Sequence, residues 1–280
     1  MKTAQTPSLG VDLDWYGGTA NHEVRPLLEL LSGVVGDDPL QHVKPVLKGY
    51  AFADKSGGQG GSVWVHYGGP VGDKEGPHVQ GTGPISPAVA HALRSASVAH
   101  KVSRVDVRQD FIGDFDQCRL AFIGRCNSAG MQSRDAGSCP ESSAQLGRTV
   151  YGGSTKSVYR PTLYQKGIQL GEGFPVDYLR LEHRFMPSKS EEKAQFSRLT
   201  PIQMIGLRPV ARDLSETIAA LQVKPYKLDK LPKAKTPYHW MLKGYAKVYQ
   251  VMLEDHGTPE AVGLQIFHDL GEMGLLREDA

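Results

Sequence analysis

The chain has 280 residues and a mass of 30.5 kDa, enough for one large domain or two small ones. With 40% hydrophobic and 22% charged residues it is typical of a soluble globular protein, and its net charge of +2 is too small to indicate a nucleic-acid partner. Three cysteines without a CxxC pair argue against a disulfide framework or a zinc site and are typical of a reducing compartment.

Targeting patterns are not evident in the sequence. No apolar run approaches the roughly 20 residues that cross a bilayer. Near the N-terminus, Asp12 and Asp14 lie where a signal peptide would need its apolar core. We therefore expect a cytoplasmic protein with no membrane partner.

The first third of the chain alternates strand and turn patterns. Val11, Leu13 and Trp15 alternate with polar neighbours, which predicts a half-buried strand. A second strand is predicted at 61–67, followed by a glycine-rich turn. Pro87 at the first helical position predicts a helix over the following residues.

The middle of the chain repeats this style. Strand patterns are predicted within 102–111, 120–124, 149–154, 158–166 and 178–185, with a long loop at 127–143. VDLDWYGG in the first third resembles VDVRQDFIG in the middle, and VWVHYGGP resembles TVYGGST. The similarity leaves two readings open, chance repetition among strands or a duplicated α/β unit.

Beyond Met186 the pattern becomes helical. Thr200 and Gln203 form a capping box, and helices are predicted from Thr236 to Gly257 and from Thr258 to Gly271. Seven lysines and one acid occupy 224–247, either a solvated face or a surface that tracks phosphates. The candidates for DNA contact there are Lys227, Lys230, Lys233 and Lys235.

These patterns predict an α+β fold, a mainly antiparallel central sheet with flanking helices and a small helical C-terminal part. We expect an N-terminal α/β part at 1–97, a catalytic core at 98–222 and a basic helical part at 223–280.

Two strands carry acids between arginines. Alternation places Arg104, Asp106, Arg108 and Asp110 on one face of a strand. The two acids are about 13 Å apart along a straight strand, so Asp106 is the better direct metal ligand and Asp110 a supporting or structural group. Such a strand is equally typical of a surface ion-pair ladder.

The second such strand contains RLEHR. Its alternation places Arg180 and Glu182 on one face and His183 on the other. We therefore expect His183 to be packed or on the surface, and to be a ligand only if the strand twists or ends there. Neighbouring arginines favour the charged form of Glu182, which suits a metal ligand and equally a salt bridge.

Between them lies a strand with two tyrosines. Tyr164 shares a face with Lys166, whereas Tyr159 lies on the other face beside Arg160. A tyrosine of ordinary pKa near 10 needs a neighbouring cation or base to become a nucleophile, which favours Tyr164 over Tyr159. Pro161 cannot donate to a ladder, so we expect this strand at an edge or with a bulge.

In this order the motifs resemble the replication initiation factor family of rolling-circle plasmids, filamentous phages and related relaxases. The family pattern is R-x-D-x-x-x-D, then T-x-Y-x-G-S-x-x-S, then Y-x-K, then R-x-E. This chain has Arg104-Asp106-Asp110, Thr149-Tyr151-Gly153-Ser154-Ser157, Tyr164-Lys166 and Arg180-Glu182. It departs from the family at Thr162, where an arginine is common, and it contains no His-x-His metal motif.

The resemblance implies a rolling-circle initiator that nicks one strand at a replication origin. Tyr164 would be the nucleophile, with Asp106 and Glu182 holding Mg²⁺ or Mn²⁺, the ions that carboxylates prefer. Arg104, Arg108, Arg160 and Arg180 would contact phosphate. Its expected partners are single-stranded or hairpin origin DNA and a bacterial host's helicase and polymerase. Two alternatives stay open, a non-catalytic origin-binding or repressor protein and a conjugative relaxase.

Overall fold

A computed structural model describes residues 10–58, 61–136, 147–228 and 250–272. The chain divides into two compact units, residues 1–229 and 230–280. The boundary predicted at 97/98 falls within the first unit, between two halves of one sheet, and that unit extends past residue 222.

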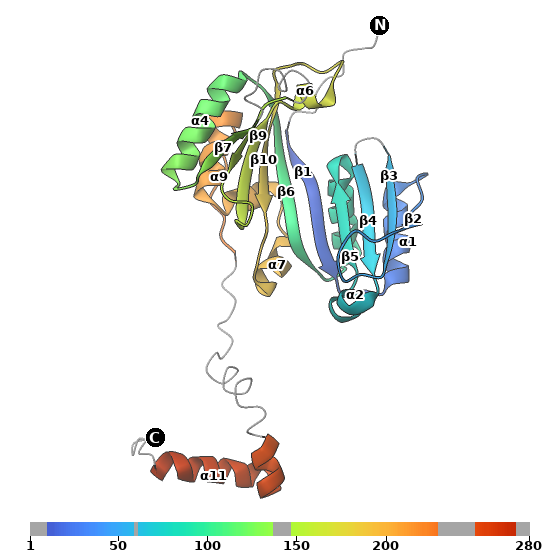
Figure 1. Cartoon of the computed structure of the whole chain (residues 1–280), viewed down its shortest axis with the longest axis vertical. Helices are drawn as coiled ribbons and strands as arrows, with labels where there is room; N and C mark the ends of the chain where they lie inside the picture. The colour runs from blue at the N-terminus through green and yellow to red at the C-terminus, as the bar shows by residue number, and fades with distance from the viewer. Residues whose placement is uncertain (1–9, 59–60, 137–146, 229–249, 273–280) are drawn as a thin grey trace. The chain divides into compact units, whose positions relative to one another are not determined.

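The first unit is built on one antiparallel sheet of ten strands in the order β2-β3-β4-β5-β1-β6-β10-β9-β8-β7 (Figure 1). Their bounds are β1 Gly10–Ala20, β2 Gln41–Val43, β3 Phe52–Gly58, β4 Gly61–Tyr67, β5 His78–Thr82, β6 His100–Ile112, β7 Ser133–Ala136, β8 Thr149–Gly152, β9 Tyr159–Tyr164 and β10 Tyr178–Phe185. The predicted α+β fold with a mainly antiparallel sheet is confirmed.

The two halves of the sheet have the same topology. In each half a long strand is followed by a helix, three strands, a short helix and a further strand that returns beside the first. The long strands β1 and β6 are neighbours at the centre. The similar segments VDLDWYGG and VDVRQDFIG lie in these two equivalent strands. The similar segments VWVHYGGP and TVYGGST lie in β4 and β8, which are not equivalent.

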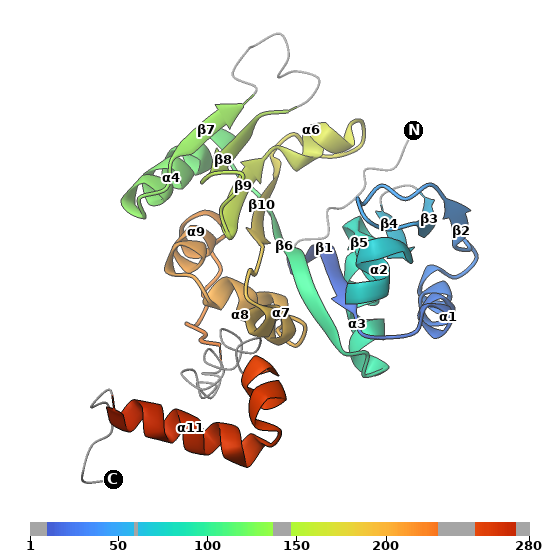
Figure 2. The same cartoon turned by 60° about the horizontal axis from the view of Figure 1, so that its bottom comes forward.

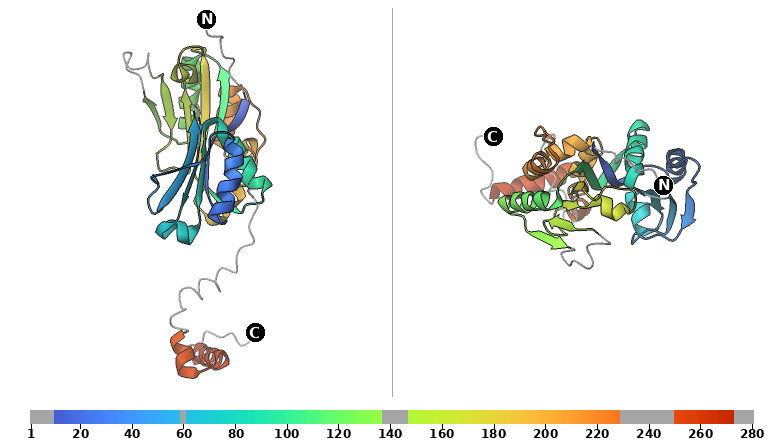
Figure 3. Two further views of the ribbon diagram at one scale, coloured as in Figure 1. Left: turned by 90° about the vertical axis from the view of Figure 1, so that its right-hand side faces the viewer. Right: turned by 90° about the horizontal axis from the view of Figure 1, so that it is seen from above.

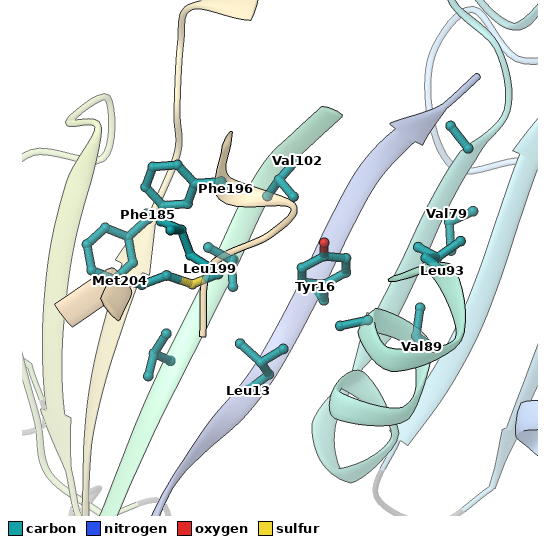
Figure 4. Close-up of a cluster of buried hydrophobic side chains, with 14 of the residues drawn as sticks. Leu13, Tyr16, Val79, Val89, Leu93, Val102, Phe185, Phe196, Leu199 and Met204 are labelled. Carbon is teal, nitrogen blue, oxygen red and sulfur yellow. The ribbon is translucent and has the colours of Figure 1, made fainter. Parts of the chain in front are cut away.

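Helices cover the core face of the sheet. Helices α1 Val24–Val35 and α3 Ser86–Ser95 lie together on one side of the first half (Figure 3). Four further helices pack on the second half of the sheet: α4 Phe115–Ser128, α7 Ser190–Phe196, α8 Pro201–Gly206 and α9 Pro209–Ala219. Helices α8 and α9 lie side by side (Figure 2). Between the helices and the strands, buried apolar side chains such as Leu13, Val102 and Phe185 form the core (Figure 4).

Two short helices, α2 Gly69–Glu75 and α6 Lys166–Leu170, follow equivalent strands. The capping box at Thr200 and Gln203 is present at the start of α8, as the sequence predicts. The predicted helix after Ser86 is also confirmed.

The structure corrects the predicted alternation in β1. The register shifts between Leu13 and Trp15, so that Asp14 is an extra residue in the ladder. As a result Tyr16, and not Trp15, is buried in the core, at 1% exposure. The pattern of residue types alone could not reveal this bulge.

Two other local predictions were wrong. Residues 120–124 belong to helix α4 and not to a strand, because Asp114 caps the helix by accepting a hydrogen bond from the backbone N–H of Gln117. Phe115, Phe122 and Cys126 then fall on one buried face at helical spacing. The loop predicted at 127–143 contains the strand β7.

Strand β9 is not at an edge of the sheet, as Pro161 had suggested, but lies between β10 and β8. The pairing of β9 with β8 ends at Thr162, whose partner is Tyr151. Pro161, the next residue toward the start of β9, has no partner in β8, so its missing N–H is tolerated.

In the second unit, helix α11 Pro259–Glu272 begins directly after Thr258, whose hydroxyl accepts a hydrogen bond from the N–H of Ala261. This confirms the predicted last helix. Most of the helix predicted from Thr236 lies outside the described residues, although 250–256 are helical. Among the described residues, no helix is long and apolar enough to cross a membrane.

Candidate functional site

The face of the sheet opposite the core carries a ladder of ionised side chains. Strands β6, β10 and β9 are consecutive neighbours, so the three motif-bearing segments meet as the sequence predicts. Alternation turns every second side chain of these strands away from the core helices. This side of the sheet is called the polar face below.

Asp106 and Glu182 share one guanidinium on this polar face. Arg184 Nη2 lies 3.1 Å from a carboxylate oxygen of Asp106 and 3.1 Å from one of Glu182. Asp106 also accepts hydrogen bonds from Arg104 through both of its oxygens. Asp106 therefore pairs with both Arg104 and Arg184, whereas Glu182 pairs with the same Arg184 that Asp106 uses.

Glu182 is the electrostatically unusual carboxyl of this face. It is 8% exposed, and burial raises its pKa to about 7, with the nearby charge of Asp106 adding to the rise. The opposing effect of Arg184 does not cancel these two contributions. At neutral pH the site therefore holds a carboxyl that an additional cation would keep ionised.

Asp110 has a different environment from Glu182. Arg180 donates to both of its oxygens, over 2.6 Å and 2.9 Å, and a third donor of Arg180 lies 2.6 Å from Asp14. Arg108 lies 3.5 Å from Asp110. Asp110 was included among the candidate metal ligands, but its oxygens are engaged by this buried pair, which joins β6 to β10.

Tyr164 is the last residue of β9 and lies on the polar face. Its Cα partner on β10 is Arg180. Burial raises its pKa above the usual value, the charges of Glu182 and Asp14 add to the rise, and Arg180 opposes it. The phenol is therefore protonated at neutral pH and needs an acceptor for its proton before it could attack.

Lys166 follows at the first position of α6. Its Nζ lies 5.9 Å from the centre of the Tyr164 ring and donates to Gln169 over 2.9 Å. Burial lowers its pKa, as does the neighbouring charge of Arg180. A lysine of lowered pKa is a suitable proton acceptor.

Tyr164 and Glu182 line one pocket of about 210 Å³, together with side chains of four elements. The remaining lining residues are Thr149, Tyr151, Thr162, Gln169 and Arg184. A second pocket of about 520 Å³ lies beside it and is lined by Lys166, Arg180 and Asp14, among others.

Tyr159 lies on the core face, away from this pocket. It is 5% exposed, and its hydroxyl lies 2.8 Å from His183 Nδ1, while Gln109 lies 2.8 Å from the other ring nitrogen. Burial lowers the pKa of His183 to about 3, so the imidazole is neutral. It is packed, which is one of the two environments expected from the sequence. The structure thus separates Tyr159 from the carboxylates and leaves Tyr164 among them.

The donor chemistry of the predicted metal site is suitable, but its arrangement is not that of a complete site. Among the described residues, no group of three or more His, Cys, Asp or Glu side chains could hold a metal ion. Asp106 and Glu182 offer carboxylate oxygens, which suit Mg²⁺ or Mn²⁺, with Arg184 between them. The raised pKa of Glu182 is the observation that favours a further cation here.

The other residues predicted to contact phosphate or DNA lie in several parts of the chain. Arg160 lies over the ring of Tyr151, 4.5 Å from its centre, and Arg108 lies 3.8 Å from Asp12. Lys227 is exposed at the end of the first unit. Lys230, Lys233 and Lys235 lie outside the described residues.

Two residues of the site escaped the sequence analysis. Arg184 bridges the two carboxylates, and the RLEHR alternation already placed it on the correct face. Asp14 reaches Arg180 from β1, more than 160 positions away in sequence, and no local pattern could indicate it.

Comparison with solved structures identifies a similar fold. The structure of a rolling circle replication initiator protein from Geobacillus stearothermophilus superposes with a TM-score of 0.55 at 16% identity, over 79% of this chain and all of the other. The chain therefore shares the fold of that initiator, in agreement with the resemblance of its motifs. No family model matches the sequence, and no curated protein matches it.

Proposed function

We propose that this protein initiates rolling-circle DNA replication by nicking one strand at an origin with Tyr164. The observation that carries the proposal is the pocket where Tyr164 meets Glu182 on the polar face, on a fold shared with a rolling-circle initiator. A hydroxyl nucleophile, a lysine that can take its proton and two carboxylates that can hold a cation are suited to phosphodiester cleavage through a covalent intermediate.

The proposed reaction begins with proton transfer from the Tyr164 hydroxyl to Lys166. Burial favours the neutral amine of Lys166, and the resulting ammonium then stabilises the phenolate. The phenolate oxygen attacks the scissile phosphorus, an O–P bond forms to Tyr164, and the bond to the 3′ oxygen breaks. The leaving oxygen takes up the proton that Lys166 holds, through water, which gives a free 3′-OH, a 5′-phosphotyrosine link and the neutral lysine again.

Religation is the same reaction in reverse. The 3′-OH attacks the phosphotyrosine, the phosphodiester forms again, and Tyr164 is released. Because the link keeps one phosphate ester in place of another, no nucleotide cofactor is needed.

Asp106 and Glu182 would hold a divalent cation, Mg²⁺ or Mn²⁺. When bound, this ion would polarise the phosphate and offset its growing negative charge. Arg184 would then be free to contact a phosphate oxygen together with Arg104, because guanidinium groups pair well with phosphates.

A single experiment tests the proposal. The protein is incubated with single-stranded origin DNA and Mn²⁺, and the covalent protein–DNA adduct is measured on a denaturing gel. We expect an adduct from the unmodified chain and from Tyr151→Phe, a control that lines the same pocket, but none from Tyr164→Phe. An undiminished adduct in Tyr164→Phe, or in excess EDTA, contradicts the proposed nucleophile or the metal, respectively.

A non-catalytic DNA-binding protein is the second candidate. It is favoured by the ion pairs that already neutralise Asp106 and Asp110, since such a ladder needs no metal. In that case the unmodified chain would bind origin DNA and form no adduct with any divalent ion. Under either function we infer a bacterial cytoplasmic setting, and for the initiator a host helicase and polymerase acting at the free 3′-OH.

A further inference from the structure

Three aromatic rings on the polar face each have a cation stacked on them. Arg160 lies 4.5 Å from the ring centre of Tyr151, and Arg134 lies 5.3 Å from it. Arg104 lies 4.0 Å from the ring of Trp15, and Lys55 lies 4.9 Å from that of Trp64. These rings come from β8, β1 and β4, so the pairs extend from the second half of the sheet into the first.

The strand register places these pairs in rows across the sheet. One row of Cα partners runs through Arg160, Arg184, Asp106 and Trp15. A second row lies two residues further along β1 and is parallel to the first. It runs through Arg104, Gly17, Gln80, Trp64 and Lys55. The candidate site therefore lies within a band of cations and rings that runs across the strands.

Gly17, at the centre of this band, leaves room for the rings of Trp15 and His78 and is itself buried. A Cβ at that position would lie 3.3 Å from Trp15 Nε1 and 3.6 Å from His78 Nε2. On the far side of His78, the ring of His66 stacks on Trp64, with centres 5.4 Å apart and planes only 7° from parallel. The ring of His78 in turn lies 6.4 Å from that of His66, centre to centre, and His66 is fully buried beneath its neighbours.

The side chains of this band lie on the face of the sheet opposite the core. Val63, Val65 and Val79 fill the core face of the same strands and are fully buried, whereas Trp15, Trp64 and Tyr151 are only partly buried. Partly buried rings beside cations match a ligand that presents flat apolar faces together with negative charge.

We propose that this band binds single-stranded nucleic acid along a path across the sheet, from Tyr151 through the Tyr164 pocket to Trp64. Unpaired bases offer their faces to the rings, and the arginines and lysine meet the phosphates. A duplex keeps its bases stacked on one another and would use only the cations. The course of the path through the Tyr164 pocket rests on the proposed function. Binding by the rings and cations does not depend on whether the chain cleaves DNA.

The geometry sets the length of strand that the far end of the band would require. Strand β4 is four strand spacings from β10 in the sheet order, which is about 19 Å. An oligonucleotide of about 2 nucleotides is too short to reach from the Tyr164 pocket to Trp64, whereas one of about 16 nucleotides covers the band.

The test uses the full chain and fluorescently labelled oligonucleotides of these two lengths. Replacement of one stacking ring is expected to weaken binding by about 5- to 150-fold, so Trp64→Leu should lose that much affinity for the long oligonucleotide. Affinity for the short one should stay unchanged, and Trp64→Phe, which keeps a ring, should recover most of the loss. Phe52→Leu serves as the matched control, because Phe52 is an exposed ring on the core side of β3 and should have no effect.

A second variant tests the cation. Lys55→Gln should lower the slope of log affinity against log salt by about 0.7 for the long oligonucleotide. Both variants are first shown to be folded by circular dichroism. Unchanged affinity and salt slope in folded variants would overturn the proposal, and so would an equal loss for a duplex of the same length.

The outcomes separate this inference from the nicking reaction. An adduct through Tyr164 with no role for Trp64 or Lys55 would overturn the band and leave the proposed function standing. Loss of long-oligonucleotide binding in Trp64→Leu, without any adduct from the unmodified chain, would support the band and overturn the nicking chemistry.

Discussion

Among the residues of the polar face, three carboxyls that look alike in sequence have different electrostatic environments. Asp106 is held by two arginines and Asp110 is clamped by Arg180 through both oxygens. Glu182 shares Arg184 with Asp106, and burial favours its neutral form. A group of this kind, with a pKa near the working pH and a defined neighbour, is a candidate for function.

We predict that Glu182 makes the stability of the protein depend on pH. Its pKa rises from 4.5 to about 7 on folding, so between these values the folded state holds a proton that the unfolded state has lost. Stability from this group should therefore fall as pH rises from about 4.5 to about 7, by at most on the order of 3 kcal/mol, and stay level above. Urea unfolding of Glu182→Gln should show a flatter profile, whereas the exposed control Glu29→Gln should keep the original one.

The same residue should report the metal. If Asp106 and Glu182 bind Mn²⁺, the ion should raise the melting temperature more at a pH well above 7 than at a pH below 4.5, because only ionised Glu182 is a ligand. Thermal unfolding with and without Mn²⁺ measures this difference. A shift of the same size in Glu182→Gln would show that the ion binds elsewhere.

At the scale of elements, the site depends on the pairing of β6 with β10. The Arg180–Asp110 pair joins these two strands, and both side chains are almost fully buried. Helix α6 then places Lys166 beside the end of β9. The position of Tyr164 relative to the carboxylates is thus set by three neighbouring strands and one short helix.

We predict that Asp110→Asn is strongly destabilising. The substitution removes the charged partner that accepts two of Arg180's hydrogen bonds and leaves only the partly exposed Asp14 to offset this buried guanidinium. Breaking a buried ion pair typically costs about 3–5 kcal/mol, and Asp14 makes the lower end of that range the expected loss. The matched control is Asp116→Asn, since Asp116 pairs with Arg148 on the surface and should have little effect. Urea unfolding measures both, and equal stabilities would show that the buried pair does not hold the strands.

Sequence patterns predicted these strands well where one face is uniformly apolar. Alternation placed Asp106 and Glu182 correctly, because Val105, Val107 and Leu181 must all face the core. It failed at Asp14, where a bulge adds a residue and reverses the faces that follow. The shared contacts of Arg184 were also beyond prediction, because they depend on the register between β6 and β10.

For the whole molecule, the two halves of the sheet have the same topology and different chemistry. Tyr67 ends β4 before α2, just as Tyr164 ends β9 before α6. The hydroxyl of Tyr67, however, donates a hydrogen bond to Asp54, and the Cα partner of Asp54 is the core residue Val65. Two residues after Tyr67, where Lys166 follows Tyr164, the chain has Gly69. Only the second half therefore combines a tyrosine with the lysine and carboxylates of the polar face, while the first half contributes aromatic rings to it.

The identity of the residue that becomes joined to DNA tests the account most directly. The adduct formed with single-stranded origin DNA and Mn²⁺ is digested with nuclease and protease, and the modified peptide is sequenced by mass spectrometry. We predict a 5′-linked nucleotide on Tyr164. A nucleotide on any other residue, or a link through the 3′ end of the cleaved strand, would contradict the proposed role of Tyr164.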